Sequence, residues 1–171
     1  MLQLSFLLFY KLDRVIREKI PCGFAVHNEP DDSNNEGDYA SALYMNYFQA
    51  PNAPRLFRIH VHGDFYSVDY FSMWVRIAKA NPTTTFLAFT KQYDIIKNQI
   101  NYLPDNFSLV WSAWPGIPIP EDVREALPVA WMQDGTENRI PADATLCVGS
   151  CQACHAKCWT LKHQDVVFEK H

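Results

Sequence analysis

The sequence predicts an α/β fold in which helices cover a parallel sheet. Between residues 56 and 133, short runs rich in β-branched and aromatic residues alternate with longer runs of helical periodicity. This alternation is typical of parallel strands joined by crossover helices. The chain has 171 residues and is 48% hydrophobic, which suits one domain (residues 1–171) but is too short for a complete eight-fold barrel. We therefore expect a partial barrel or an open sheet.

Four strands are predicted by their apolar alternation and β-branched content. They cover residues 56–62, 84–89, 107–113 and 129–132. Upstream of them, helical periodicity predicts helices over residues 12–19 and 40–49. The polar, turn-rich stretch 29–38 between these two helices is expected to be a surface loop.

Three helices are expected between the strands. Ser67 can cap a helix over residues 68–80, because its hydroxyl can accept a hydrogen bond from a free backbone N–H of the first turn. Isoleucines at helical spacing predict a second helix over residues 93–102. A third, short helix should begin at Pro120, since proline is preorganised for the first turn of a helix.

Four of the five cysteines lie within twelve residues near the C-terminus. Their spacing is C-x3-C-x2-C-x3-C, and residues 147–159 form a candidate metal-binding segment. The candidate ligands are Cys147, Cys151, Cys154 and Cys158. Structural zinc sites usually take ligands from two hooks separated by a longer loop, whereas compact cysteine runs are typical of iron–sulfur clusters. We expect a four-iron, four-sulfur (4Fe-4S) cluster, with zinc as the alternative metal and disulfides or free thiols as a third reading.

Charge and the N-terminus restrict the partners. The net charge is −4 and no long basic run is present, so duplex nucleic acid is not favoured as a partner. The apolar residues 1–10 are too few to span a bilayer and lack the basic start of a signal peptide. We therefore expect no membrane partner, a cytoplasmic location and reduced cysteines, which favours a metal over disulfides.

Polar side chains gather at the carboxyl ends of the predicted strands, where parallel sheets bind their ligands. Alternation puts Arg58, His60, His62 and Asp64 on one face of the first strand. The candidate catalytic residues are Arg58, His60, Asp64 and Lys91, and the candidate cofactor-binding residues are Trp111 and Ser112. Such groups suit a pocket for a small molecule or a nucleotide.

Three motifs follow one another along the chain: an R-x-H-x-x-G-D-F element at residues 58–65, a following helix with Tyr70 and Trp74, and an F-T-K strand end at residues 89–91. In these motifs the chain resembles the phage gene product 88 family. The resemblance covers roughly residues 40–171, including Ser112 and the cysteine segment. It implies a fold similar to the incomplete α/β barrels of radical-SAM-like proteins and an origin in phages, plasmids or bacteria, but no particular activity. His62 departs from the family pattern, in which small or acidic residues are usual.

Three functions compete. The first is an iron–sulfur protein, an enzyme or electron carrier, in which the first three cysteines repeat the C-x3-C-x2-C spacing of radical SAM enzymes. Cys158 could then close the fourth position and make the cluster structural or redox-active. The second is a zinc-stabilised binding module, such as a phage protein that modulates a host protein without catalysis. The third is a hydrolase or nuclease with His60, His62 and Asp64 as metal ligands.

Overall fold

A computed structural model describes residues 47–60, 63–151, 153–155 and 157–169, together with the backbone of residues 22–24. The predicted helix over residues 12–19, the predicted loop over 29–38 and His62 lie outside these residues. Only the end of the predicted helix over 40–49 is described, and residues 47–49 are helical there.

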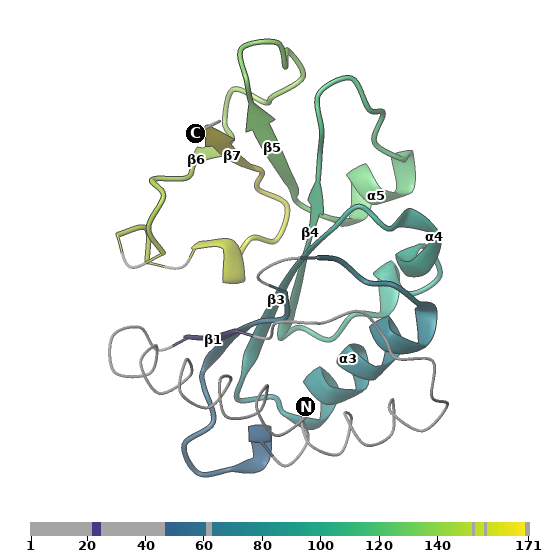
Figure 1. The fold of residues 1–171 in the computed structure, drawn as a ribbon, viewed down its shortest axis with the longest axis vertical. Coiled ribbons are helices and arrows are strands. Elements are labelled where there is room, and N and C mark those ends of the chain that lie inside the picture. Colours follow the sequence, from purple (N-terminus) through teal and green to yellow (C-terminus); the bar gives the residue numbers. More distant parts are fainter. Residues whose placement is uncertain (1–21, 25–46, 61–62, 152, 156, 170–171) are drawn as a thin grey trace, which may run out of the picture.

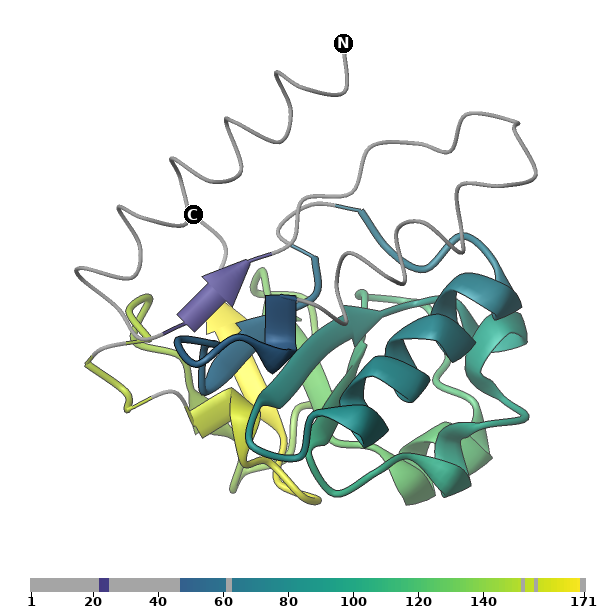
Figure 2. The ribbon, with the colours of Figure 1, turned by 90° about the horizontal axis from the view of Figure 1, so that it is seen from below.

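The described strands form one parallel sheet in the order β1-β2-β3-β4-β5-β7-β6 (Figure 1). Every neighbouring pair in this sheet runs parallel. The strands are β1 (Cys22–Phe24), β2 (Leu56–Arg58), β3 (Thr85–Thr90), β4 (Phe107–Ser112), β5 (Val129–Gln133), β6 (Thr145–Leu146) and β7 (Val166–Glu169). The predicted α/β class is therefore confirmed, and the sheet has the form of an incomplete barrel with its helices on one side (Figures 1 and 2).

The helices between the strands follow the predicted order. They are α3 (Val68–Ala80), α4 (Tyr93–Ile96) and α5 (Glu121–Ala126), with 3-10 turns η1 (Ile100–Tyr102) and η2 (Lys157–Trp159). Ser67 caps α3 as predicted, because its hydroxyl accepts a hydrogen bond from the Tyr70 backbone N–H at 3.1 Å. The predicted helix over residues 93–102 is instead split into α4 and η1. Gln99 N–H bonds to the carbonyl of Ile96 at 2.8 Å, three residues back, which tightens the chain into a turn.

The two faces of the sheet carry separate apolar clusters. On the helix face, Phe86 and Ala88 of β3 pack with α3, α4 and α5. On the opposite face, which we call the inner face, Leu87 and Phe89 of the same strand contribute to a second cluster. This alternation follows from the two-residue period of a strand. The inner face receives no described α-helix and is covered by the C-terminal segment instead (Figure 1).

Asp165 fixes β7 against β5. Its carboxylate accepts hydrogen bonds from Val129 N–H at 2.9 Å, the Trp131 indole N–H at 2.8 Å and Arg124 Nη1 at 3.0 Å. Only 4% of Asp165 is exposed, so three donors compensate a buried charge. Strand β7 was not predicted from the sequence, and this carboxylate aligns its first residue with the start of β5.

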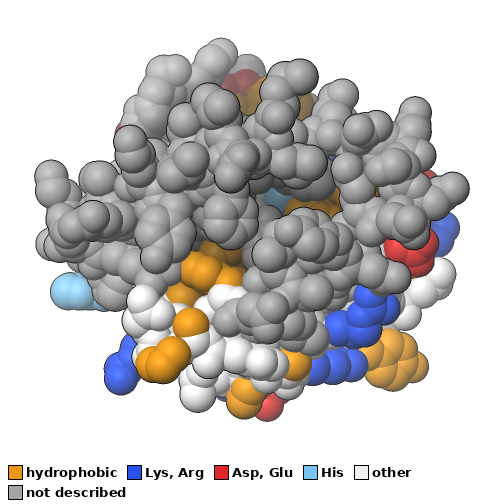
Figure 3. All heavy atoms as spheres, turned by 60° about the horizontal axis from the view of Figure 1, so that its bottom comes forward, with side chains coloured by type: hydrophobic (Ala, Val, Ile, Leu, Met, Phe, Trp, Pro, Cys, Tyr) orange, Lys and Arg blue, Asp and Glu red, His pale blue; other side chains and the backbone are white. Residues whose placement is uncertain are grey.

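The described side chains on one face of the molecule are of mixed type (Figure 3). On the face shown in Figure 3, the visible described side chains include apolar, basic and acidic groups lying among one another. None of the helices that the structure describes has the length and apolar character needed to cross a membrane.

Candidate metal and ligand site

The cysteine segment lies on the inner face of the sheet. Trp159, only 4% exposed, packs into the cluster that contains Leu87 and Val110, and Cys147 and Cys158 pack against the same cluster. Both ends of the segment are bonded to strands. Cys147 N–H donates to the carbonyl of Val167 at 2.8 Å, and the Ser108 hydroxyl donates to the carbonyl of Cys158 at 2.9 Å. The segment therefore bridges β7 and β4.

The four thiols are free and lie in one another's electrostatic field. Burial raises the pKa of Cys158 to about 11, and the neighbouring thiols of Cys147, Cys154 and Cys151 contribute to this increase. Burial also raises the pKa of Cys151, with a further contribution from Cys154. A desolvated group resists ionisation, and neighbouring thiolates resist it further because their charges repel. The four thiols thus lie near enough to one another for their charges to interact.

Arg58, at the end of β2, faces this cluster. Burial lowers the pKa of its guanidinium, whereas Cys151 and Cys158 raise it. The buried Nε of Arg58 has no hydrogen-bond partner within the described part of the chain. A buried donor without an acceptor costs free energy, so this position favours an acceptor or an anion beside the thiols.

The thiols fit a metal centre in chemical type and number. Soft thiolates suit both iron–sulfur clusters and zinc. Within the described ranges, however, no group of three or more His, Cys, Asp or Glu side chains is arranged to hold a metal ion. One zinc ion needs its thiolates about 2.3 Å from a single point, whereas a 4Fe-4S cluster distributes four thiolates over four irons. The four thiols therefore interact electrostatically, but the described side chains do not form a closed metal site.

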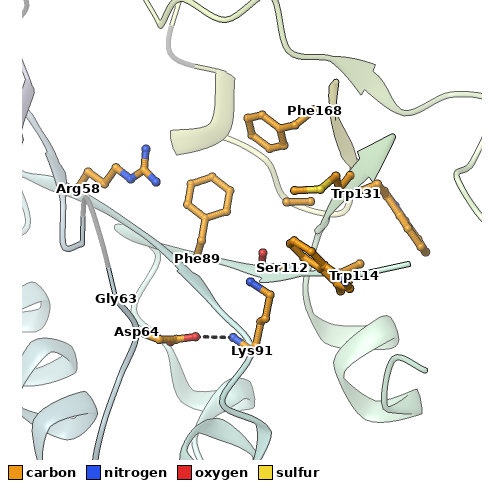
Figure 4. A pocket seen from close by; sticks show the side chains of 12 residues that line it. Arg58, Gly63, Asp64, Phe89, Lys91, Ser112, Trp114, Trp131 and Phe168 are labelled. Atoms are coloured by element: carbon orange, nitrogen blue, oxygen red, sulfur yellow. Dashed lines mark hydrogen bonds between the residues drawn. The ribbon is translucent and has the colours of Figure 1, made fainter. Parts of the chain in front are cut away.

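A cavity of about 300 Å³ lies beside the cysteine segment, toward the carboxyl ends of the strands (Figure 4). Its lining includes three of the predicted catalytic residues, Arg58, Asp64 and Lys91, and the predicted cofactor-binding residue Ser112. Aromatic rings form much of the remaining wall: Phe89, Trp114, Trp131 and Phe168. Arg58 belongs to both places, since it lines this cavity and interacts with the thiols.

Asp64 connects the ends of two strands. Its carboxylate accepts hydrogen bonds from Phe65 N–H and from Lys91 N–H, both at 2.7 Å. The preceding residue, Gly63, has a φ of 85°, which glycine adopts without steric cost. The bonds to Asp64 hold the start of the loop after β3 and so direct the Lys91 side chain. In Figure 4 that side chain extends into the cavity beside Ser112 and Trp114.

Two predicted site residues lie elsewhere. His60 is 4% exposed, with its Nε2 at 3.2 Å from the Tyr70 hydroxyl and its ring against Phe65. The prediction that His60 shares a face with Arg58 fails, because β2 ends at Arg58 and the His60 ring lies against Phe65 and Tyr70 of the helix-face core. Trp111 is 6% exposed in the helix-face core, since neighbouring residues of β4 point to opposite faces.

Sequence reasoning missed two rings of the cavity wall. Phe89 was predicted only as a strand residue. Alternation places it on the inner face with Leu87, where it lines the cavity. Phe168 belongs to β7, which was not predicted, and its ring centre lies 6.0 Å from that of Phe89. An apolar pair within the tail, Val166–Val167, was the available signal for this strand.

The comparisons with known proteins agree on one family. A model of the family described as "Gene product 88" matches residues 38–146, which is more than half of the chain and stops directly before Cys147. The chain is 40% identical over 63 residues to the "Gene 88 protein" of Mycobacterium phage L5, a stretch that is 37% of this chain and 26% of that protein. This chain thus spans about a quarter of that relative's length, and no solved structure matches it. From the match over residues 38–146 we conclude that the chain belongs to the gene product 88 family.

Proposed function

We propose that this protein is an iron–sulfur protein whose four clustered cysteines hold a 4Fe-4S cluster on the inner face of the sheet, beside a small-molecule pocket. The observation that supports it most directly is the group of four free thiols, of which Cys151 and Cys158 interact electrostatically with the guanidinium of Arg58, whose buried Nε has no described hydrogen-bond partner. A cluster bound by four thiolates carries negative charge, and the half-buried guanidinium of Arg58 would offset such charge.

The proposed ligands are Cys147, Cys151, Cys154 and Cys158. With all four bound, each iron has a protein ligand, and the cluster supplies one-electron redox chemistry. The chain's own contribution is to exclude water and to fix the thiols. Trp159 and the inner-face cluster shield one side of the segment, and the Ser108 hydroxyl holds its last turn.

The proposed cluster and the cavity would interact electrostatically through Arg58. Arg58 lies between the sulfurs and the cavity, so a change of charge on either side alters the electrostatic field at the other. Arg58, Asp64, Lys91 and Ser112 therefore remain our candidates for binding the small molecule. His60 and Asp64 already engage Tyr70 and two backbone N–H groups, and we do not retain the hydrolase hypothesis.

Metal analysis of anaerobically purified protein tests the proposal. We expect iron and acid-labile sulfide in equal amounts, with a broad visible absorption shoulder that dithionite bleaches. Serine replacement of each of the four cysteines should lower iron content, whereas Cys22→Ser, outside the segment, serves as the matched control and should retain it. Circular dichroism shows whether each variant is folded.

Other outcomes would contradict the proposal. Stoichiometric zinc without sulfide would reject the iron–sulfur centre and support the alternative, a zinc-stabilised binding module or host-modulating protein without catalysis. Colourless protein that retains no metal after anaerobic reconstitution would reject both.

A further inference from the structure

We infer that the cavity at the strand ends binds a small planar anion, an aromatic ring that carries a carboxylate or a phosphate. This inference deepens the proposed function, because it rests on the pocket described there and names the chemical class of its ligand. It does not depend on which metal, if any, the cysteines hold.

The charges in the cavity wall favour an anion. Arg58 and Lys91 are its two cationic side chains, and Asp64 is the one acidic residue in the described lining. The Asp64 carboxylate already accepts two backbone hydrogen bonds, from Phe65 and from Lys91. No described carboxylate forms an ion pair with Lys91 Nζ or with the Arg58 guanidinium. The cavity thus has an excess of positive charge and donors, which a carboxylate or phosphate would complement.

The donors come from different strands and face a common space. In Figure 4 the Lys91 ammonium extends beside the Ser112 hydroxyl, and the Arg58 guanidinium turns toward Phe89 from the opposite side. Ser112 Oγ can donate one further hydrogen bond to an anion. A ligand anion near Lys91 and Ser112 would therefore lie at one end of the cavity.

The remaining walls favour a flat apolar body. The rings of Phe89 and Phe168 meet edge to face, with an interplanar angle of 76°. On the other side of the cavity, Trp114 is 47% exposed and its ring centre lies 5.7 Å from Lys91 Nζ. Aromatic walls of this kind stack on planar rings. A cavity of about 300 Å³ is at the small end of the range for ligand pockets, which suits a benzoate-sized molecule or a mononucleotide.

Matched pairs of anionic and neutral probes test the inference on the full chain. Benzoate is compared with benzamide, and adenosine 5′-monophosphate with adenosine, by following the indole N–H resonances of Trp114 and Trp131. We expect one or both anions to shift these resonances saturably and to bind about tenfold or more tightly than the neutral partner, since hydrogen bonds to a charged group are stronger than those to a neutral one. The pair that responds distinguishes a carboxylate ligand from a phosphate ligand.

Lys91→Gln should weaken binding of the responding anion about tenfold, because it removes the charge but keeps most of the side chain. Lys79→Gln is the matched control, since Lys79 is an exposed lysine in the last turn of α3, outside the cavity lining. Equal binding of anion and neutral partner, an unchanged affinity in Lys91→Gln, or no saturable shift by either anion would each overturn the inference.

Iron and sulfide are measured on the same samples. Protein that contains a cluster but ignores the anions would reject this inference and leave the cluster proposal standing. Protein that binds the anions but contains no iron would support this inference and reject the cluster proposal.

Discussion

The guanidinium carbon of Arg58 lies 5.0 Å from the centre of the Phe89 ring, across the neighbouring strands β2 and β3. Phe89 in turn belongs to the apolar cluster on which the cysteine segment rests. The attraction between a cation and the face of an aromatic ring stabilises the guanidinium in this position. The contact therefore holds a charged side chain near both the sulfurs and the cavity. Arg58 is therefore the residue through which the two proposed sites would interact.

If the proposed cluster is present, replacing Arg58 with Gln should lower its reduction potential. A nearby positive charge favours the more negative, reduced state of the cluster, so its loss makes reduction harder. We expect a fall on the order of tens of millivolts, measured by a redox titration followed by electron paramagnetic resonance. Arg55→Gln is the control, because Arg55 is an exposed arginine that does not line the cavity. An unchanged potential in Arg58→Gln protein with full iron content would contradict this role.

Ser108→Ala should make the cysteine segment release the proposed metal faster. The Ser108 hydroxyl donates to the carbonyl of Cys158 at 2.9 Å, and losing such a bond costs about 1 kcal/mol. The measurement is the rate of iron loss to a chelator under anaerobic conditions. Ser72→Ala is a matched control, since the Ser72 hydroxyl accepts a 2.8 Å bond from Gln99 on the helix side. Equal rates in the two variants would show that the bond to Cys158 does not hold the segment.

Elements with local signals were predictable from the sequence. Helix α3 has its cap at Ser67 and an apolar stripe, and it was predicted with its observed bounds. Strands β3, β4 and β5 were predicted to within one residue at each end. Such elements carry their information in neighbouring residues, which periodicity and capping rules can detect.

Elements that depend on distant contacts were missed. Strand β7 is inserted between β5 and β6 by the buried contacts of Asp165, and β6 has only two residues. The cavity could be placed at the strand ends in advance, but Phe168 could not be assigned to its wall without β7. His60 was placed on the wrong face because strand bounds are the least certain part of such a prediction. The four cysteines could be grouped by their local spacing, and their role as metal ligands stays a prediction.

Asp165→Asn should destabilise the fold. The Asp165 carboxylate accepts from Val129 N–H, Trp131 Nε1 and Arg124 Nη1, and an amide cannot accept with both of its ends. We expect a loss of about 2–4 kcal/mol, since a buried, charge-assisted network loses acceptor capacity. Urea unfolding followed by circular dichroism gives the value. Asp105→Asn, at an exposed position, should change stability by less than about 0.5 kcal/mol. A similarly small change in Asp165→Asn would mean that the backbone pairing and apolar contacts of β7 hold it without this carboxylate.

The loop that carries Trp114 should loosen in acid. Arg139 donates to the carboxylate of Glu137 through Nε at 2.8 Å and through Nη2, and also to the carbonyls of Ile117 and Trp114 at 2.8 and 3.2 Å. The hydrogen bonds from Arg139 lower the pKa of Glu137. A carboxylate with a lowered folded-state pKa stabilises the fold above its unfolded pKa of about 4.3, and this contribution is lost as the pH falls through the lower, folded value.

The stability difference between the unaltered protein and Glu137→Gln should therefore be constant from neutral pH down to about pH 5 and shrink below about pH 4. Urea unfolding over this pH range measures it, and the indole resonance of Trp114 should broaden over the same interval. Glu121→Gln is the control, because Glu121 lies in the exposed first turn of α5 and contacts no part of this loop in the described structure. A difference that grows in acid would mean that Glu137 is better accommodated in its protonated form, and that Arg139 holds Trp114 without it.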